Sequence, residues 1–213
     1  GAGITLVGSH AGIEIGADGP SQMGLEDLGM FRMLHGTTVL YPADAVAAEN
    51  LTVLARKQDH ITYVRTTRGA TPVIYQNSAE FKVGGSHTLI DPKTPHIILA
   101  AAGITLHEAL YAAHELKKHK INAAVIDLYS VKPLDKKSLT TLAKKCNKIL
   151  TIEDHAPEGG IGDAVASLLS GKATVHKLAV YGIPRSGKTE ELLHHFKIDA
   201  KHIVKQVKVI LKK

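Results

Sequence analysis

Short apolar runs alternate with helix-like segments along this chain, and the alternation limits the fold more than any other feature. It is clearest in the second half, where an apolar run closed by Gly103 leads into a helical pattern. The predicted strands there are His96–Ala102, Ala123–Leu128, Lys148–Ile152 and Val175–Val180. The predicted helices are Leu106–His119, a segment ending at Lys145, Ile161–Leu169, Glu190–Phe196 and Ala200–Leu211. Such alternation predicts a mostly parallel sheet that is covered on both faces.

The first half shows the same alternation with fewer elements. Its predicted strands are Ile4–Val7, Thr38–Tyr41 and Ile61–Arg65, with Pro72–Tyr75 as a further candidate, and its predicted helices are Leu25–Leu34 and Ala45–Lys57. These elements are too few for a complete doubly wound domain. We therefore expect an α/β chain in three parts: residues 1–75 as a truncated α/β domain, residues 76–95 as a linker, and residues 96–213 as a smaller, mostly parallel, three-layer domain.

Side-chain patterns also predict where some helices begin. Asp44 and Asp135 each stand where a carboxylate can accept hydrogen bonds from the first turn of a predicted helix. Thr105 precedes Glu108 by three residues, which is the spacing of a capping box.

Composition narrows the class of protein. Hydrophobic residues make up 44% and charged residues 22%, as in an ordinary globular domain, and no apolar run is long enough to cross a bilayer. The single cysteine, Cys146, rules out an internal disulfide and favours a reducing, cytoplasmic location. Residues 96–213 hold 19 Lys/Arg against 11 Asp/Glu, but aromatic residues are only 4% of the chain. We interpret the basic half as a solvated surface and expect neither nucleic acid nor membrane as a partner.

The stretch from Val7 to Arg32 is the most informative part of the chain. It leads from a predicted strand, through a glycine-rich loop, into a predicted helix. The loop includes the glycines and polar residues Gly8, Ser9, His10, Gly12, Gly16, Asp18, Gly19, Ser21 and Gln22. Glycine allows close approach of a ligand, and open α/β sheets bind ligands at the carboxyl ends of their strands. The residues alone leave two interpretations open: a polyol or phosphate site, and a surface loop held by turns.

A family resemblance begins in the same stretch. Residues 16–23 are Gly-Ala-Asp-Gly-Pro-Ser-Gln-Met, followed by Leu25-Glu26-Asp27-Leu28 and Met30-Phe31-Arg32. The other matching segments are residues 41–44, 65–68, 103–110, 132–135, 153–155, 158–162 and 184–188. Taken in this order over nearly the whole chain, they resemble the pyrimidine-binding and C-terminal domains of transketolases. The resemblance is closest to the vertebrate-like variety, which has Gln at position 22 where yeast and plant enzymes have His.

The resemblance implies an activity and its cofactors. Transketolases use thiamine diphosphate and a divalent cation, Mg²⁺ or Ca²⁺, to move a two-carbon ketol unit between sugar phosphates, in a site built across a homodimer. The glutamate that activates the cofactor, the aromatic residues around its pyrimidine ring and the diphosphate- and metal-binding domain are expected upstream of this chain. We therefore assign no catalytic residue and no metal ligand here, and expect the chain alone to be inactive. Deoxyxylulose phosphate synthase and the β subunit of 2-oxo acid dehydrogenases are alternatives within the same cofactor class.

The resemblance also assigns roles to four side chains. His10 and Arg68 match residues that hold the sugar phosphate, for which imidazole and guanidinium are suitable donors. Asp18 matches a carboxylate that accepts hydrogen bonds from substrate hydroxyls, and Gln22 matches a polar residue beside the cofactor. Without the resemblance, Arg68 would be interpreted as part of a surface ion pair and Asp18 as a residue that stabilises a turn.

Residues 182–189 fit the pattern of a nucleotide-binding P-loop, between a predicted strand and a predicted helix. Two features argue against that function: Pro184 removes a backbone donor from the loop, and no later apolar strand ends in an aspartate that could hold magnesium. A third possibility is that the C-terminal unit serves only in the assembly of a dimer.

The segment Glu153-Asp154-His155, with Glu158, offers carboxylate and imidazole groups that could bind a metal. We favour a different interpretation, in which the segment packs against the neighbouring domain or subunit. The 13 histidines are scattered, and none lies in a compact cluster of Cys and His in the sequence.

Overall fold

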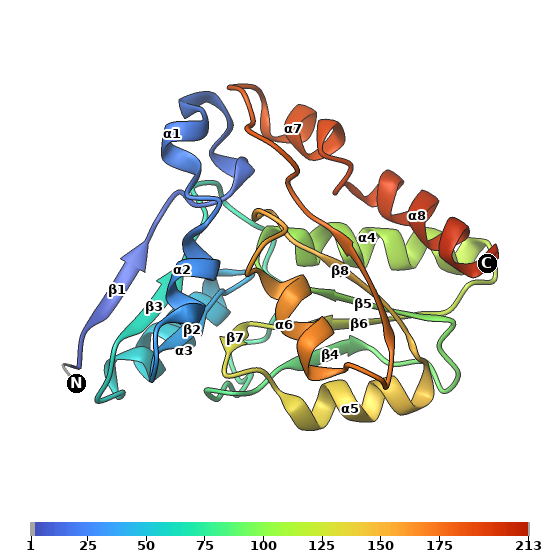
Figure 1. Cartoon of the computed structure of the whole chain (residues 1–213), viewed down its shortest axis with the longest axis horizontal. Helices are drawn as coiled ribbons and strands as arrows, with labels where there is room; N and C mark the ends of the chain where they lie inside the picture. Colours follow the sequence, from blue (N-terminus) through green and yellow to red (C-terminus); the bar gives the residue numbers. More distant parts are fainter. Residues whose placement is uncertain (1–2, 213) are drawn as a thin grey trace.

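The computed structural model describes residues 3–212, which form two mixed β-sheets with helices packed on them (Figure 1). The strands are β1 (Thr5–Gly8), β2 (Thr38–Leu40), β3 (Thr62–Arg65), β4 (His87–Ile90), β5 (Ile97–Ala101), β6 (Ala123–Asp127), β7 (Ser130–Lys132), β8 (Lys148–Ile152) and β9 (Thr174–Leu178). The helices are the 3₁₀ helix η1 (Ile13–Asp18), α1 (Pro20–Met23), α2 (Asp27–Met33), α3 (Ala45–Arg56), α4 (Ile104–Lys118), α5 (Lys136–Lys145), α6 (Ile161–Leu168), α7 (Thr189–His195) and α8 (Ala200–Lys212). The predicted α/β class is confirmed.

The second sheet is the centre of a three-layer unit. Its strand order is β4-β6-β5-β8-β9, and all neighbours are parallel except β4 and β6. Alternate residues of β5 pack on opposite faces. Ile97 and Leu99 share a core with α4 and α8, whereas Ile98 and Ala100 share a core with α5 and α6. The sheet is therefore buried on both faces, which explains why its strands are continuous apolar runs.

Two strands were not predicted, and both change the expected organisation. β4 lies within residues 76–95, where a linker was expected, and it pairs antiparallel with β6. β7 lies in the second half of the chain, but it pairs antiparallel with β2 in the first sheet, whose order is β1-β3-β2-β7. Both are short strands at the edge of a sheet. The two halves of the chain are consequently interlocked through β7.

Two of the predicted helix starts are confirmed, and the predicted capping box is wrong. The caps are confirmed, because the carboxylate of Asp44 accepts a hydrogen bond from Ala47 N at 2.8 Å and that of Asp135 accepts one from Ser138 N at 3.0 Å. The capping box at Thr105 is wrong. The Thr105 hydroxyl donates instead to the carbonyl groups of residues 102 and 152, and the Glu108 carboxylate accepts from the backbone N–H of residue 200.

The expected strand Pro72–Tyr75 is also wrong, since the structure has no strand there. The backbone N–H groups of Ile74 and Tyr75 donate to the Asp44 carboxylate at 2.7 and 2.9 Å. One side chain thus takes the place of a neighbouring strand as the acceptor for this segment.

Strand β1 forms an edge of the first sheet (Figure 1). Ile4, Leu6 and Val7 leave 47%, 42% and 57% of their surfaces exposed, so this edge carries an apolar surface. Within residues 3–212, no helix combines the length and the apolar character needed to cross a membrane.

Candidate functional site

Two loops run side by side at the carboxyl ends of β1 and β3. The strands are parallel, so both chains leave the sheet at the same edge. Beyond the strands, Thr66 N donates to Gly8 O at 2.8 Å and Ala11 N donates to Thr66 O at 3.1 Å. The glycine-rich segment after β1 is therefore joined to the segment after β3, which leads to Arg68.

Buried side chains anchor the glycine-rich segment. Ile13, Ile15 and Met23 are almost completely buried in the main core. The backbone closes on itself where Gly12 N donates to Met23 O at 2.6 Å, with Gly12 at a φ of 84° that favours glycine. Because the apolar residues point inward, the polar residues between them, including Asp18, remain exposed.

The structure brings Asp18 and Arg68, two of the predicted substrate-binding residues, into contact. The Arg68 Nη1 atom donates to Asp18 Oδ1 at 3.2 Å, and the two side chains are 51% and 45% exposed. His10 and Gln22 lie on the same glycine-rich segment and are exposed as well. The imidazole Nδ1 of His10 lies 3.0 Å from the hydroxyl of the neighbouring Ser9. The direct contact is thus limited to Asp18 and Arg68.

Glu14 is a residue of this site that sequence reasoning missed. Its carboxylate accepts hydrogen bonds from Arg68 N at 2.8 Å and Gly69 N at 3.0 Å, and so fixes the loop that carries the Arg68 side chain. A Cβ atom at Gly69 would collide with the same carboxylate. No spacing signal marks Glu14, because its partners lie 54 and 55 residues away.

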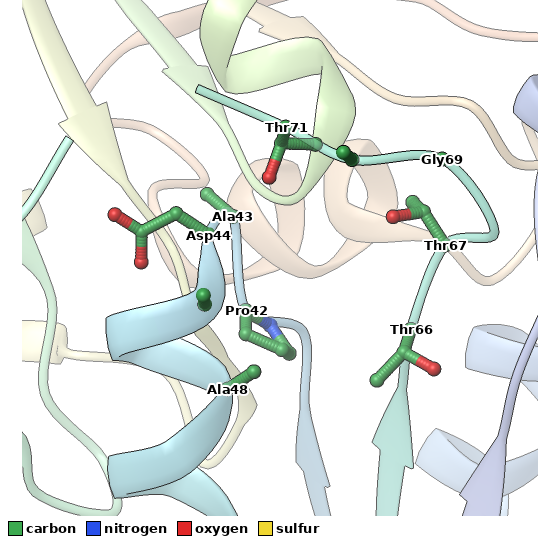
Figure 2. A pocket seen from close by; sticks show the side chains of 10 residues that line it. Pro42, Ala43, Asp44, Ala48, Thr66, Thr67, Gly69 and Thr71 are labelled. Atoms are coloured by element: carbon green, nitrogen blue, oxygen red, sulfur yellow. The ribbon is translucent and has the colours of Figure 1, made fainter. Parts of the chain in front are cut away.

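A small cavity opens at the carboxyl ends of β2 and β3 (Figure 2). It has a volume of about 250 Å³ and lies between the Pro42–Ala48 region and the loop from Thr66 to Thr71. Its walls combine small apolar side chains with threonine hydroxyl groups. Pockets for drug-sized ligands usually have roughly 300–1,000 Å³, so this cavity can take only a part of a larger ligand.

A buried ionic cluster underlies the exposed residues. Arg65, at the end of β3, is completely buried and donates from Nε to the Asp27 carboxylate at 2.9 Å. Its Nη1 atom donates to Asp154 Oδ1 at 2.8 Å. The hydroxyl of Tyr63 donates to Asp27 at 2.6 Å, and that of Tyr41 donates to Asp154 at 3.0 Å. The cluster joins β3 and α2 of the first sheet to the segment after β8 of the second sheet.

Electrostatics keeps the guanidinium of Arg65 charged. Burial alone would lower the pKa of Arg65, but the carboxylates of Asp154 and Asp27 hold it well above its usual value. Burial and the neighbouring Asp27 carboxylate raise the pKa of Tyr63 strongly, so its phenol remains a hydrogen-bond donor. The cluster is a scaffold that holds the site and offers no group to a ligand.

Two family models match this chain, and both describe domains of transketolase. The family model described as "Transketolase, C-terminal domain" matches residues 86–203, and the model described as "Transketolase, pyrimidine binding domain" matches residues 1–73. The chain belongs to the transketolase family. Transketolase of Homo sapiens is 47% identical over 213 residues, covering 99% of this chain and 34% of that protein. Transketolase-like protein 1 of Bos taurus is 47% identical, covering 99% of this chain and 36% of that protein.

Solved transketolase structures have the same fold. A chain described as a split gene transketolase, inactive β4 tetramer, superposes with a TM-score of 0.89 at 30% identity and covers 98% of this chain and 67% of that chain. A mutant transketolase of Pichia stipitis superposes with a TM-score of 0.79 at 22% identity and covers 99% of this chain and 30% of that chain. This chain spans about a third of the length of the curated transketolases that it matches.

The P-loop interpretation of residues 182–189 is not favoured in a transketolase of this structure. Gly187 N donates to Gly16 O at 3.3 Å, and the hydroxyl of Thr189 donates to Glu14 O at 2.8 Å. A P-loop needs its backbone N–H groups for phosphate and its Ser/Thr hydroxyl for Mg²⁺, whereas here both groups bind the glycine-rich segment. The loop before α7 therefore supports the glycine-rich segment from the side of the second unit.

The segment after β8 packs against the neighbouring unit, as we favoured. Asp154 binds Arg65, and Glu153 accepts from the backbone N–H of Gly162 at 3.0 Å at the start of α6. His155 Nε2 lies 3.2 Å from Gly29 N. Burial raises the pKa of Glu153 to about 8, although the N–H groups of α6 lower it. Asp154 and His155 therefore join the second unit to the first, whereas Glu153 holds the start of α6.

Proposed function

We propose that this chain supplies the sugar-phosphate-binding part of a transketolase, an enzyme that transfers a two-carbon ketol unit between sugar phosphates. The exposed pair Asp18–Arg68, on loops that buried residues hold in place, carries this proposal. Membership of the transketolase family supports this class of reaction.

In this proposal Arg68 binds the phosphate group of the substrate. Its ion pair with Asp18 is half-exposed, and such pairs contribute about 0–1 kcal/mol to stability, so a phosphate can replace the carboxylate at little cost. A guanidinium has five donors, and the bond to Asp18 uses one of them. His10, on the glycine-rich segment, adds a further donor. The φ of His10 is 63°, in a region that residues other than glycine rarely adopt, which is a feature often found at binding sites.

Asp18 and Gln22 act on the reacting part of the substrate. The Asp18 carboxylate accepts hydrogen bonds from sugar hydroxyl groups, which orients the ketol unit as well as binding it. The Gln22 amide donates to an oxygen that becomes negative during the reaction, and it does so without a change in its own charge. Both side chains are exposed at the edge of the parallel strands, where a substrate has access to them.

The cofactor fits this chain only in part. Thiamine diphosphate supplies the carbon nucleophile that takes up the ketol unit. Gln22 lies on the side of the site assigned to the cofactor, but the cavity beside β2 and β3 is too small for the whole molecule. Among residues 3–212, the carboxyl ends of β1, β2 and β3 hold no cluster of three metal-ligating side chains. We therefore assign the cofactor's diphosphate and its Mg²⁺ or Ca²⁺ to other parts of the assembled enzyme.

We further propose that the enzyme is a cytoplasmic homodimer and that the chain alone is inactive. The single cysteine and the partial cofactor site support these proposals. The similar split gene transketolase, which is described as an inactive β4 tetramer, supports the expected lack of activity. We also keep residues 1–75 as the pyrimidine-binding part and residues 96–213 as the core of the C-terminal domain.

The decisive experiment measures ketol transfer from a ketose phosphate to an aldose phosphate, with thiamine diphosphate and Mg²⁺, in the protein that contains this chain. We expect Arg68→Ala to raise the KM for the sugar phosphates by roughly 10-fold to 100-fold, because a charge-assisted hydrogen bond contributes about 1.5–3 kcal/mol. The free energy of unfolding should change by about 0.5 kcal/mol or less.

Arg56→Ala is the matched control, since Arg56 is an exposed arginine in the last turn of α3. It should leave the KM unchanged. Absence of ketol transfer with every sugar phosphate would overturn the proposed function. Equal KM values for the Arg68→Ala and Arg56→Ala variants would overturn the role of Arg68 alone.

A further inference from the structure

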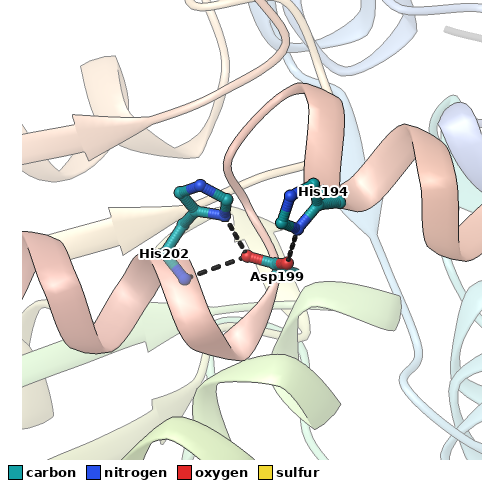
Figure 3. A group of neighbouring side chains, drawn as sticks. All are labelled: His194, Asp199 and His202. Atoms are coloured by element: carbon teal, nitrogen blue, oxygen red, sulfur yellow. Dashed lines mark hydrogen bonds and ion pairs between the residues drawn. The ribbon is translucent and has the colours of Figure 1, made fainter.

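Three side chains that can bind a metal meet at the junction of α7 and α8 (Figure 3). His194 lies in the last turn of α7, Asp199 precedes α8 and His202 lies in the first turn of α8. The Nδ1 atoms of His194 and His202 lie 2.8 and 2.5 Å from the two oxygens of the Asp199 carboxylate. One ligand atom of each residue lies within 4.8 Å of the others.

The backbone holds two of these groups in place. Asp199 caps α8, because its carboxylate accepts from His202 N at 2.9 Å and its carbonyl oxygen accepts from Ile203 N at 3.0 Å. Ile198 and Ile203, on either side, are completely buried in the main core. The positions of Asp199 and His202 are therefore set by the packing of α8.

The cluster is open to solvent on one side. The side chain of His194 is 57% exposed, whereas those of Asp199 and His202 are 19% and 18% exposed. An ion from solution can reach the imidazole of His194, and water can complete its coordination. The partial burial of the other two groups reduces the competition from water for the same ligand atoms.

We propose that His194, Asp199 and His202 bind one Zn²⁺ ion, or a similar first-row ion such as Ni²⁺ or Co²⁺. Two imidazole nitrogens and one carboxylate oxygen are a donor set typical of these metals. In tetrahedral coordination, metal–ligand bonds of about 2.0–2.2 Å place ligand atoms roughly 3.3 Å apart. The present contacts of 2.8 and 2.5 Å need only small side-chain rotations to reach that spacing.

The ion would link the end of α7 to the start of α8. Among residues 3–212, this is the only group of three such side chains within mutual reach. It uses none of the residues assigned to sugar phosphates, so the site does not depend on the proposed transketolase activity. The simpler alternative is a hydrogen-bonded His–Asp–His group that binds no ion.

Titration of the metal-free chain with Zn²⁺ against a chromophoric chelator tests the site. We expect one equivalent to bind per chain, and the melting temperature to rise with Zn²⁺ concentration. His194→Gln and His202→Gln each remove one ligand, and each should weaken binding at least tenfold. His195→Gln is the matched control, because His195 is an exposed neighbour on α7 outside the cluster. It should bind Zn²⁺ like the wild type.

Circular dichroism of the metal-free variants establishes that they are folded. If a variant does not fold, the visible absorption spectrum of the wild-type chain with Co²⁺ decides, since nitrogen and oxygen ligands in tetrahedral geometry give a spectrum unlike that of hydrated Co²⁺. A wild-type chain that binds no Zn²⁺ would overturn the proposal. Variants of His194 and His202 that bind as tightly as the His195→Gln variant would overturn it too.

Discussion

Arg65 is the last residue of β3 and Arg68 lies three residues later, in the loop that follows the strand, but the two side chains have opposite environments. Arg65 is completely buried and binds the carboxylates of Asp27 and Asp154. Arg68 is half-exposed and binds Asp18 through one hydrogen bond of 3.2 Å. Breaking the buried cluster leaves charges without partners in a region without water, whereas breaking the exposed pair returns both groups to solvent.

The two arginines have different roles within the short segment from Arg65 to Arg68. The buried arginine joins the two sheets and thereby holds the loops in place. The exposed arginine is held by one hydrogen bond, and the loss of that bond costs little free energy. A side chain is available for binding when its separation from its present partner costs little free energy. Substitutions test this difference, and the largest effect is expected in the buried cluster.

Replacing Arg65 by Met should have the largest effect. The substitution leaves the carboxylates of Asp27 and Asp154 buried without a cation, and breaking a buried ion pair in this way costs about 3–5 kcal/mol. The free energy of unfolding from urea denaturation measures the loss. Arg68→Met is the control and should change that free energy by about 0.5 kcal/mol or less. Similar losses for the two variants would contradict the comparison.

Gly12→Ala should have the next largest effect, because Gly12 packs directly on the buried cluster. A Cβ atom at Gly12 would collide with the Asp154 carboxylate, whose carbon would be 2.7 Å away, and the φ of 84° disfavours alanine. We expect a loss of about 3 kcal/mol, which combines this collision with the backbone cost.

Gly36→Ala separates the cost of the positive φ from the cost of the collision. Gly36 has a φ of 69°, but a Cβ atom there would have no neighbour within 4 Å. Its substitution should therefore cost only the backbone term, about 1 kcal/mol. Both variants can be compared by thermal and urea denaturation. If they lose equal stability, close packing against Asp154 is not the cause.

Asp127 is a buried carboxylate that, unlike Asp27 and Asp154, has no arginine as a partner. Its Oδ2 atom accepts from the Tyr75 hydroxyl at 2.6 Å, and burial raises its pKa from 3.8 to about 7. The folded state therefore holds a proton that the unfolded state has released above about pH 4. The stability that Asp127 contributes is present below about pH 4 and is lost as the pH rises to about 7.

Asp127→Asn should remove this dependence, since the amide does not titrate. The free energy of unfolding of the wild type relative to the variant should fall by about 3 kcal/mol between pH 4.5 and pH 8. Urea denaturation at the two pH values measures the difference. A difference that does not change with pH would show that Asp127 has a normal pKa.

The smallest effect is expected at Thr189, which supports the exposed loop from the second unit. Thr189→Val keeps the shape of the side chain but removes the hydrogen bond of 2.8 Å to Glu14 O, at a cost of about 1 kcal/mol. Amide hydrogen exchange in η1 should become faster. Thr52→Val, at an exposed position on α3, should leave that exchange unchanged. Equal exchange rates in the two variants would argue against support from this loop.

Much of the fold and part of the site could be predicted from the sequence. Apolar periodicity located the long strands and helices, since burial on a sheet face or along a helix stripe leaves a local pattern. The short edge strands β4 and β7 were missed, because a strand of three or four residues gains its stability from a partner that is remote in the sequence. Asp18 and Arg68 were named from the family resemblance, and the structure shows that they are in contact, whereas Glu14 carried no signal.

The sequence by itself determined the α/β class, the caps at Asp44 and Asp135, and the family to which the chain belongs. These depend on periodicity and on motifs, which are properties of neighbouring residues. Only the tertiary structure decided that Arg65 is buried while Arg68 is exposed, and that His194, Asp199 and His202 form one cluster. Burial and the choice of ionic partner depend on contacts such as that of Arg65 with Asp154, which joins residues 89 positions apart.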